Sequence, residues 1–331
     1  MAGLGTNVLT LQDWAKRLGP DGKVPSIVEL LEQTNEILMD MQWVEGNLPT
    51  GHRTTVRTGL PTAAWRLLNQ GIQPTKSRTV QIDEAVGMLE AWSEVDKDLA
   101  ELNGNTSAFR LSEAQAFIES MNQEMAATLF YGNSSLDPEE FTGLSVRYSD
   151  TTAGNGQNIV LGGGPGPDQS SIWLVCWGMN SVCGIFPKGS VAGLIHEDMG
   201  LVTVETTAGI AGNRMRAYQD RWQWKIGIAL KDWRYAVRIP NVDISQIAAG
   251  ATDLTNLMIQ AIHRIPNLNM GKPVFYMNRS VFQYLDIQRL TAVTAGGGLT
   301  YENVDGRIIP KFRQIPIRLC DSLTENEATV A

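Results

Sequence analysis

The sequence predicts an α+β fold in which the other segments pack against one long helix. Three observations support it: helical periodicity over residues 111–133, two extended segments within 46–94, and a β-rich region that begins after Pro138. With 331 residues, of which 43% are apolar, the chain can bury a sizeable core. Its length alone indicates about two domains.

Two N-terminal helices are predicted at 10–18 and 26–41, separated by a segment rich in glycine and proline. Ser26 and Glu29 have the spacing of a capping box, and the residues that follow are apolar on one face. This second helix has little nearby chain to pack against. We therefore assign both helices to an arm.

The segment 46–94 is predicted to run out and back as a long β-hairpin. Residues 53–58 are β-prone, and alternation of apolar residues resumes at 80–86, whereas 69–77 has the composition of a loop tip. A lone two-stranded hairpin is only marginally stable in water, so this one needs a surface supplied by its own chain or by a neighbour. Two ordinary strands of an internal sheet would also fit the pattern.

The helix at 111–133 is predicted from apolar residues that recur every three or four positions. Ser112 with Gln115 has the form of a capping box, and Gly132 would end the helix in a left-handed conformation. Its length of about 30 Å is large for a globular domain, although an ordinary core helix would also fit. The predicted buried stripe consists of Leu111, Ala114, Ile118, Met121, Met125 and Leu129.

The region after Pro138 is predicted to be mainly strands. Residues 155–169 read as a flexible exposed loop, and 172–177 as a buried strand. Alternation over 222–230 changes phase at 231–232 before it resumes, which predicts a bulge or turn there.

The last third of the chain is predicted to hold a helix at 253–265 and a β-α unit. In that unit a strand at 274–277 leads into a helix capped by Asn278. Residues 301–318 are predicted as a hairpin that turns at Asp305-Gly306, and 324–331 as a polar tail.

The composition argues against a nucleic-acid-binding protein that works by charge. The formal net charge is −8, from 27 basic and 35 acidic residues with no long run of either sign, so any contact with DNA should be local. Cys176, Cys183 and Cys320 form neither an even set nor a CxxC pair. This predicts buried thiols in a reducing compartment, with no disulfide or metal site.

We expect neither a signal peptide nor a membrane span. The first residues lack a basic start followed by a long apolar run, and no window approaches about 18 consecutive apolar residues. These features predict a protein of the cytoplasm, or of something assembled there.

The search for catalytic, cofactor-binding and metal-binding residues yields no candidate. His52, His196 and His263 lie far apart, and the sequence after His196 is not HExxH because Gly200 occupies the second histidine position. The glycines of 162–166 lack the lysine and hydroxyl residue of a phosphate-binding loop, and a strand follows them. We therefore expect that the protein is not an enzyme.

A cluster of carboxylates near the end of the hairpin region is a second feature that could bind a cation. A solvated surface explains it better than a bound cation. Its members are Glu94, Asp96, Asp98 and Glu101.

Six segments carry a resemblance to a known family, and their order along the chain matters more than any one of them. They are GLPTAAWRLLNQGIQPTKS (59–77), the helix at 112–133, PEEFTGL (138–144), ALKDWRYAVRI (229–239), KPVFYMNRSVFQYL (272–285) and DGRIIPKFRQIPIRLCDSL (305–323). In this order the chain resembles the major capsid proteins of tailed bacteriophages, which have the Hong Kong 97-like fold. It is most similar to coat proteins of podovirus-type phages.

The resemblance implies a domain plan. Residues 1–45 would form an N-terminal arm, and 46–100 an extended loop, the E-loop, that lies across a neighbouring subunit. Residues 101–150 and 222–265 would form a peripheral domain with a long spine helix. An axial domain with a central sheet and an insert would comprise 151–221 and 266–331.

The resemblance also implies a function. The protein would self-assemble into the hexamers and pentamers of an icosahedral shell that encloses double-stranded DNA, in a virion assembled in the host cytoplasm. Scaffolding, cement or decoration, and portal proteins would be partners, and packaged DNA would be held by weak non-specific contact. Some relatives cross-link subunits through a lysine and an asparagine, but Lys76 has no evident partner and no cross-link is expected.

Two alternatives remain at this point. An encapsulin-type compartment would share the fold and hold a protein cargo. A soluble α/β enzyme that binds a nucleotide at 162–166 is the more distant alternative.

Overall fold

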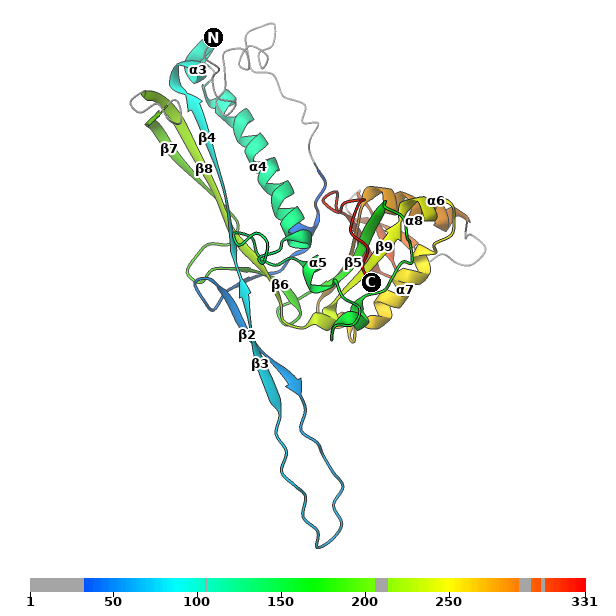
Figure 1. Ribbon diagram of the computed structural model, residues 1–331. Coiled ribbons are helices and arrows are strands. Elements are labelled where there is room, and N and C mark those ends of the chain that lie inside the picture. Colours follow the sequence, from blue (N-terminus) through cyan, green and yellow to red (C-terminus); the bar gives the residue numbers. More distant parts are fainter. Residues whose placement is uncertain (1–32, 105, 206–213, 292–298, 305–306) are drawn as a thin grey trace. The chain divides into compact units, whose positions relative to one another are not determined.

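The structure is a computed structural model that describes residues 33–331 except 105, 206–213, 292–298 and 305–306 (Figure 1). The contacts divide the described chain into two units. Unit 1 comprises Met88–Met125 and Gly193–Lys225, with Gln33. Unit 2 comprises Thr34–Gly87, Ala126–Ala192 and Ile226–Ala331. The predicted helix at 10–18 lies outside the described residues.

Unit 1 combines long strands with most of one long helix. Its elements are β4 (Gly87–Asp96), α3 (Lys97–Glu101), η1 (Leu102–Gly104), most of α4 (Thr106–Tyr131), β7 (Leu194–Glu205) and the first part of β8 (Arg214–Leu230). β7 pairs antiparallel with β8, from Leu194 opposite Trp224 to Glu205 opposite Arg214. Phe117 of α4 stacks on Trp222 at 5.3 Å between ring centroids, which joins the helix to the strand pair.

Unit 2 contains a sheet centred on β5 (Gln169–Trp177), whose residues are all buried. β10 (Lys272–Met277) and β9 (Ala236–Asp243) pair antiparallel with β5, and β13 (Ile315–Leu319) lies parallel to β10. β12 (Arg307–Phe312) and β11 (Leu299–Val304) extend the sheet beyond β13. On the other side, β6 (Val182–Phe186) pairs with the end of β8 and with the short strand β1 (Trp43–Glu45).

The remaining elements of unit 2 are short helices and one hairpin. The helices and single turns are α2 (Ile37–Asp40), α5 (Leu144–Arg147), η2 (Gly156–Asn158), η3 (Trp233–Tyr235), α6 (Ile244–Ala248), α7 (Leu254–Arg264), η4 (Leu268–Met270) and α8 (Arg279–Thr291). The hairpin consists of β2 (Gly51–Gly59) and β3 (Arg78–Ala85).

Several local predictions are confirmed. Asp253 caps α7 by accepting a hydrogen bond from the Asn256 amide, and Asn278 accepts one from the Ser280 amide at the start of α8. The C-terminal hairpin predicted at 301–318 is correct only in its first part: β11 pairs with β12, and its turn at 305–306 lies outside the described residues, whereas residues 315–319 form a separate strand, β13. The phase change after Leu230 is the η3 turn between β8 and β9.

The long helix begins earlier than predicted and ends where predicted, at Tyr131 directly before Gly132, although not by the predicted conformation. α4 begins at Thr106, so Ser112 lies inside it and donates to the Phe109 carbonyl instead of capping. Gly132 does not take a left-handed conformation. A Cβ there would lie 2.5 Å from the Phe141 carbonyl oxygen, so close packing requires this glycine.

The predicted apolar stripe of the helix is correct only in part. Met121, Met125 and Leu129 are buried, but Leu111 and Ile118 are exposed.

The predicted helix at 26–41 is wrong over its described part. Asn35 forms a bridge with Cys320, and only Ile37–Asp40 is helical. The N-terminal arm expected at 1–45 therefore does not include its last residues, because β1 is part of the sheet of unit 2.

Two stretches expected to be loose are fixed. In the predicted flexible loop 155–169, Ile159, Val160 and Gln169 are buried. In the predicted polar tail, Glu327 and Val330 make buried hydrogen bonds.

Two strands that are far apart in the sequence lie together in unit 2. Trp173 of β5 pairs directly with Arg238 of β9. Because β9 pairs with β5, the whole of β9 lies in unit 2.

Candidate interaction surface

Of the hairpin predicted at 46–94, the structure has residues 51–85, whereas the residues that follow form β4 of another strand pair. β2 and β3 pair from Gly51 opposite Ala85 to Gly59 opposite Arg78 (Figure 1). Between them, residues 60–77 leave the ladder and turn at Asn69, whose φ is 66°. The only side-chain bond within this described segment runs from the Thr75 hydroxyl to the Thr62 carbonyl.

The far part of the hairpin is exposed throughout. Every residue from 60 to 83 is exposed, and the side chain of Trp65 has 104% of its reference accessibility. A contiguous set of apolar side chains left in water marks a surface that another molecule covers. The large apolar side chains in this set are Leu60, Trp65, Leu67, Leu68, Ile72, Val80 and Ile82.

The base of the hairpin is held by a charge pair. The guanidinium of Arg147 on α5 donates from both terminal nitrogens to the carboxylate of Glu84, at 2.5 and 2.6 Å, and both side chains are largely buried. Arg147 also donates to the Thr142 carbonyl. Bidentate pairs of this kind fix direction as well as distance.

A second ion pair joins β2 to β3, one residue nearer the tip of the hairpin. Arg53 donates two bonds of 2.6 Å to Asp83, and this contact holds the pKa of Asp83 below its ordinary value. Beyond it, no ion pair crosses the two strands within the described residues. No local pattern in the sequence indicates the pair of Arg147 and Glu84, because the two residues are 63 positions apart.

The C-terminal segment is bound into unit 2 by a buried ion pair. Arg238 donates to Glu327 at 2.8 Å, with only 5% and 4% of the two side chains exposed. Glu327 also accepts hydrogen bonds from the hydroxyls of Tyr131 and Ser171. Burial, together with the nearby charge of Glu327, raises the pKa of Tyr131. Charge of this kind inside a protein is tolerated only when it is fully paired.

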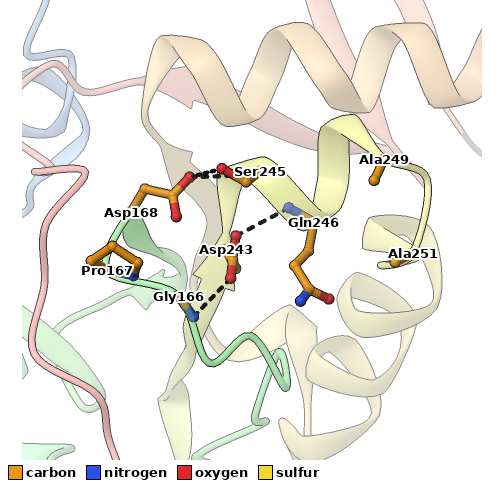
Figure 2. A pocket seen from close by; sticks show the side chains of 8 residues that line it. All are labelled: Gly166, Pro167, Asp168, Asp243, Ser245, Gln246, Ala249 and Ala251. Atoms are coloured by element: carbon orange, nitrogen blue, oxygen red, sulfur yellow. Dashed lines mark hydrogen bonds between the residues drawn. The ribbon is translucent and has the colours of Figure 1, made fainter.

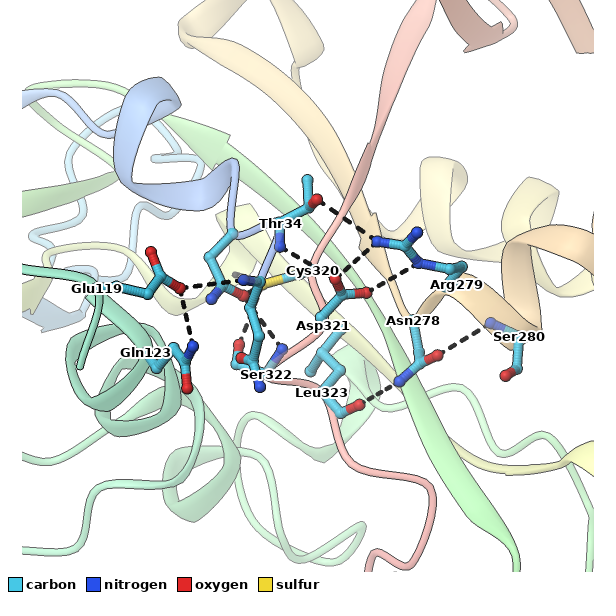
Figure 3. A network of polar contacts seen from close by, with 12 residues as sticks. Thr34, Glu119, Gln123, Asn278, Arg279, Ser280, Cys320, Asp321, Ser322 and Leu323 are labelled. Atoms are coloured by element: carbon cyan, nitrogen blue, oxygen red, sulfur yellow. Dashed lines mark hydrogen bonds and ion pairs between the residues drawn. The ribbon is translucent and has the colours of Figure 1, made fainter. Parts of the chain in front are cut away.

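Residues 320–323 are fastened to the chain at Thr34 (Figure 3). The carboxylate of Asp321 accepts from the Thr34 amide at 3.0 Å and from Arg279 at 2.8 Å. Asn278 donates to the Leu323 carbonyl. These bonds explain why the described part of the helix predicted at 26–41 is helical only at Ile37–Asp40.

Close packing requires three of the glycines in 162–166, namely Gly162, Gly164 and Gly166. Figure 2 shows Gly166 beside Asp243. A Cβ on Gly164 would lie 2.1 Å from the Cβ of Asp243, and the Gly166 amide donates to the Asp243 carboxylate at 2.9 Å. The adjoining hollow, of about 450 Å³, is lined by Asp168 as well as Asp243. Two carboxylates would repel a phosphate, so the nucleotide-binding alternative has no support at this loop.

The backbone amides at the start of α6 already have hydrogen-bond acceptors. The amides of Ser245 and Gln246 donate to Asp168 and Asp243 respectively. The Ser245 hydroxyl donates to Asp168 and lowers the pKa of that carboxyl, which keeps it charged.

The contacts of His196 all lie within unit 1. His196 stacks on Trp222 and contacts Asp220 at 3.0 Å, but Arg110 neutralises Asp220 and Asp198 at 2.9 and 2.8 Å. Within the described ranges, no group of three or more histidine, cysteine or acidic residues could hold a metal ion. Burial lowers the pKa of His52.

The cysteines are buried, as predicted. Burial raises the thiol pKa of Cys176 to about 11 and that of Cys320 to about 12, and it also raises the pKa of Cys183. Such thiols are largely protonated at neutral pH and are poor nucleophiles.

The carboxylate cluster at 94–101 has structural uses. Glu94 accepts from Gln219, Asp96 caps α3, and Glu101 pairs with Lys97.

Over the portion of the chain that the structure covers, no helix has the length and apolar character needed to span a membrane.

Comparison with known proteins gives one family and one close fold. A family model described as "Major capsid protein GP7" matches residues 19–331. A chain in the solved structure of bacteriophage Epsilon15 is 33% identical over the full length of both chains, with a TM-score of 0.77. No curated protein sequence matches this chain.

More distant structures have TM-scores below 0.5, and no argument rests on them. The SrpI encapsulin of Synechococcus elongatus PCC 7942 is 14% identical, with a TM-score of 0.46, and covers 72% of this chain and 98% of its own. The capsid of a native GTA particle is 10% identical, with a TM-score of 0.44, and covers 65% of this chain and 92% of its own.

Proposed function

Because the chain belongs to the family of major capsid protein GP7, we propose that the exposed hairpin of each subunit lies across a neighbouring subunit of the shell. The protein is a structural coat protein with the Hong Kong 97-like fold, and its copies form the icosahedral shell of a phage virion. The encapsulin alternative has less support, because no specific feature of this chain favours a protein cargo.

The observation that carries the proposal is the exposure of every residue from 60 to 83. An isolated two-stranded ribbon with seven large apolar side chains in water has too little support from its own chain. A shell supplies the missing surface many times over, so each contact can be modest. We assign this hairpin, residues 51–85, to the E-loop expected within 46–100.

The two units suggest a revised domain plan. We assign unit 1, with most of α4, to the peripheral domain, and the sheet of unit 2 to the axial domain that meets its copies in hexamers and pentamers. The support is the pairing of β9 with β5, which keeps 236–243 with the central sheet.

The partners other than the protein itself are also proposals. We expect scaffolding, cement or decoration, and portal proteins, and assembly in the host cytoplasm. A net charge of −8 would limit packaged DNA to weak, non-specific contact. We expect no enzymatic activity.

Electron microscopy and sedimentation of the full-length protein, alone and with a scaffolding protein, test the proposal. Deleting 69–77 should leave a folded monomer and impair shell formation, because the tip contacts a neighbour and not its own core. Trp65→Ser should act in the same direction. Met39→Ser, at another exposed apolar residue outside the hairpin, is the control and should assemble normally. Unchanged assembly by the deletion variant would refute the role given to the hairpin.

A further inference from the structure

The far part of the hairpin, defined here as residues 54–82, is basic although the protein is acidic. It contains four cations and no carboxylate. None of the four forms an ion pair with any described residue, and three of them, Arg66, Lys76 and Arg78, lie where every side chain is exposed. The fourth is Arg57. The partner that covers this surface must therefore offer negative charge as well as apolar area.

One loop of the same chain has the complementary character. We call residues 135–140, between α4 and α5, the acidic loop. It presents Asp137, Glu139 and Glu140, whose side chains have no hydrogen-bond or ion-pair partner in the described chain. Leu136 lies beside them with 76% of its surface exposed.

The acidic loop has a fixed shape before any partner binds. The Gly143 amide donates to the Gly132 carbonyl at 2.8 Å and closes the ends of the loop. Inside it, the Leu136 and Asp137 amides both donate to the Asn133 carbonyl. A loop that is already ordered loses little conformational freedom on binding.

The two surfaces do not cover each other within one copy. Both belong to unit 2, and the exposure of Leu136 and Trp65 shows that neither is buried by the other. Their bases are tied into the same unit, the hairpin through Glu84 and the loop through Gly132 and Gly143. Their charges and apolar residues can therefore be satisfied between two copies.

We infer that the basic far part of the hairpin of one copy docks on the acidic loop of a neighbouring copy, an inference that rests on the proposed function. The cations face Asp137, Glu139 and Glu140, and the apolar side chains of the hairpin cover Leu136. Nucleic acid is the less suitable occupant, because a phosphate backbone offers no apolar surface for the leucines around Trp65.

Charge reversal and charge exchange test the pairing. One full-length variant carries Glu139→Lys with Glu140→Lys, and a second carries Arg66→Glu with Lys76→Glu. A third combines all four changes. Each of the first two should lower the yield of particles, measured by sedimentation and electron microscopy, at least about tenfold, because like charges then face each other. The combined variant should recover most of the yield.

The control is Asp98→Lys with Glu205→Lys, which changes the net charge by the same amount as the Glu139→Lys, Glu140→Lys variant, at exposed positions outside both surfaces. It should assemble like the unaltered protein, and circular dichroism should show every variant folded. Raising the salt concentration should weaken the unaltered contact as charges are screened.

The outcomes separate this inference from the proposed function. If deletion of 69–77 abolishes assembly while reversal at Glu139 and Glu140 has no effect, the hairpin docks elsewhere and only the inference falls. Failure of the combined variant to recover would also overturn the pairing. If Arg66→Glu with Lys76→Glu weakens binding to double-stranded DNA and leaves assembly intact, the hairpin faces nucleic acid and the inference is wrong. Normal assembly by the deletion variant would remove both.

Discussion

Replacing Glu327 with alanine should strongly destabilise the subunit. The change leaves the guanidinium of Arg238 buried without its carboxylate and removes an acceptor from the hydroxyls of Tyr131 and Ser171. Breaking a buried ion pair from one side costs about 3–5 kcal/mol, mostly because the remaining charge is unpaired. We therefore expect the free energy of unfolding to fall by about that amount.

The assay is urea denaturation of the unassembled, full-length subunit, followed by tryptophan fluorescence. Glu325→Ala is the matched control, since that exposed residue lies two positions away and, among the described residues, its carboxylate accepts only from the Ser280 hydroxyl. Its effect should stay within about 0.5 kcal/mol. Replacing Arg238 and Glu327 together with methionine should cost less than Glu327→Ala, because no charge is then stranded.

A loss below about 1 kcal/mol for Glu327→Ala would refute the reasoning. It would mean that water reaches Arg238, or that the C-terminal segment is not bound as the structure shows. Comparable losses for Glu327→Ala and Glu325→Ala would lead to the same conclusion.

Two further predictions concern unit 1. Met121→Asp should abolish soluble folded protein because it buries an unpaired charge at a position only 3% exposed. The control Leu111→Asp, on an exposed part of α4, should stay soluble. A soluble Met121→Asp variant that still assembles would contradict the assigned helix face. Contact with Arg221 lowers the pKa of Glu90 from 4.5 to about 2, so the stabilisation by this pair is present above about pH 4.5 and is lost as the pH falls towards 2. Glu90→Gln should flatten this part of the stability–pH curve in urea titrations, and an unchanged curve would count against the pair.

The sequence predicts the hairpin because the information is local. Alternation at 53–58 and 80–86 and the turn residues of 69–77 lie within one stretch of chain, and the strands pair with each other. The basic character of 54–82 was equally readable, since no carboxylate occurs there. The interaction surface could therefore have been described in more detail before the structure was known.

The predictions that failed depend on partners distant in the sequence. The capping box at Ser26 favours a continuous helix to residue 41, but the Thr34 amide bonds to Asp321 and Asn35 pairs with Cys320. Glu327 lies in a segment that reads as a polar tail, and its partner Arg238 is 89 residues away. Periodicity shows which face of an element is buried and does not name the segment that buries it.

β2 and β3 run side by side towards the exposed tip of the hairpin (Figure 1). Force applied at the exposed tip would act along β3 and reach Glu84, whose partner Arg147 is adjacent in sequence to Tyr148. The Tyr148 hydroxyl donates to the Trp233 carbonyl, and its ring packs edge-on against Trp173 of β5. A pull on the hairpin would therefore act first on α5. Tension between adjoining subunits would then be transmitted to the central strands of each subunit.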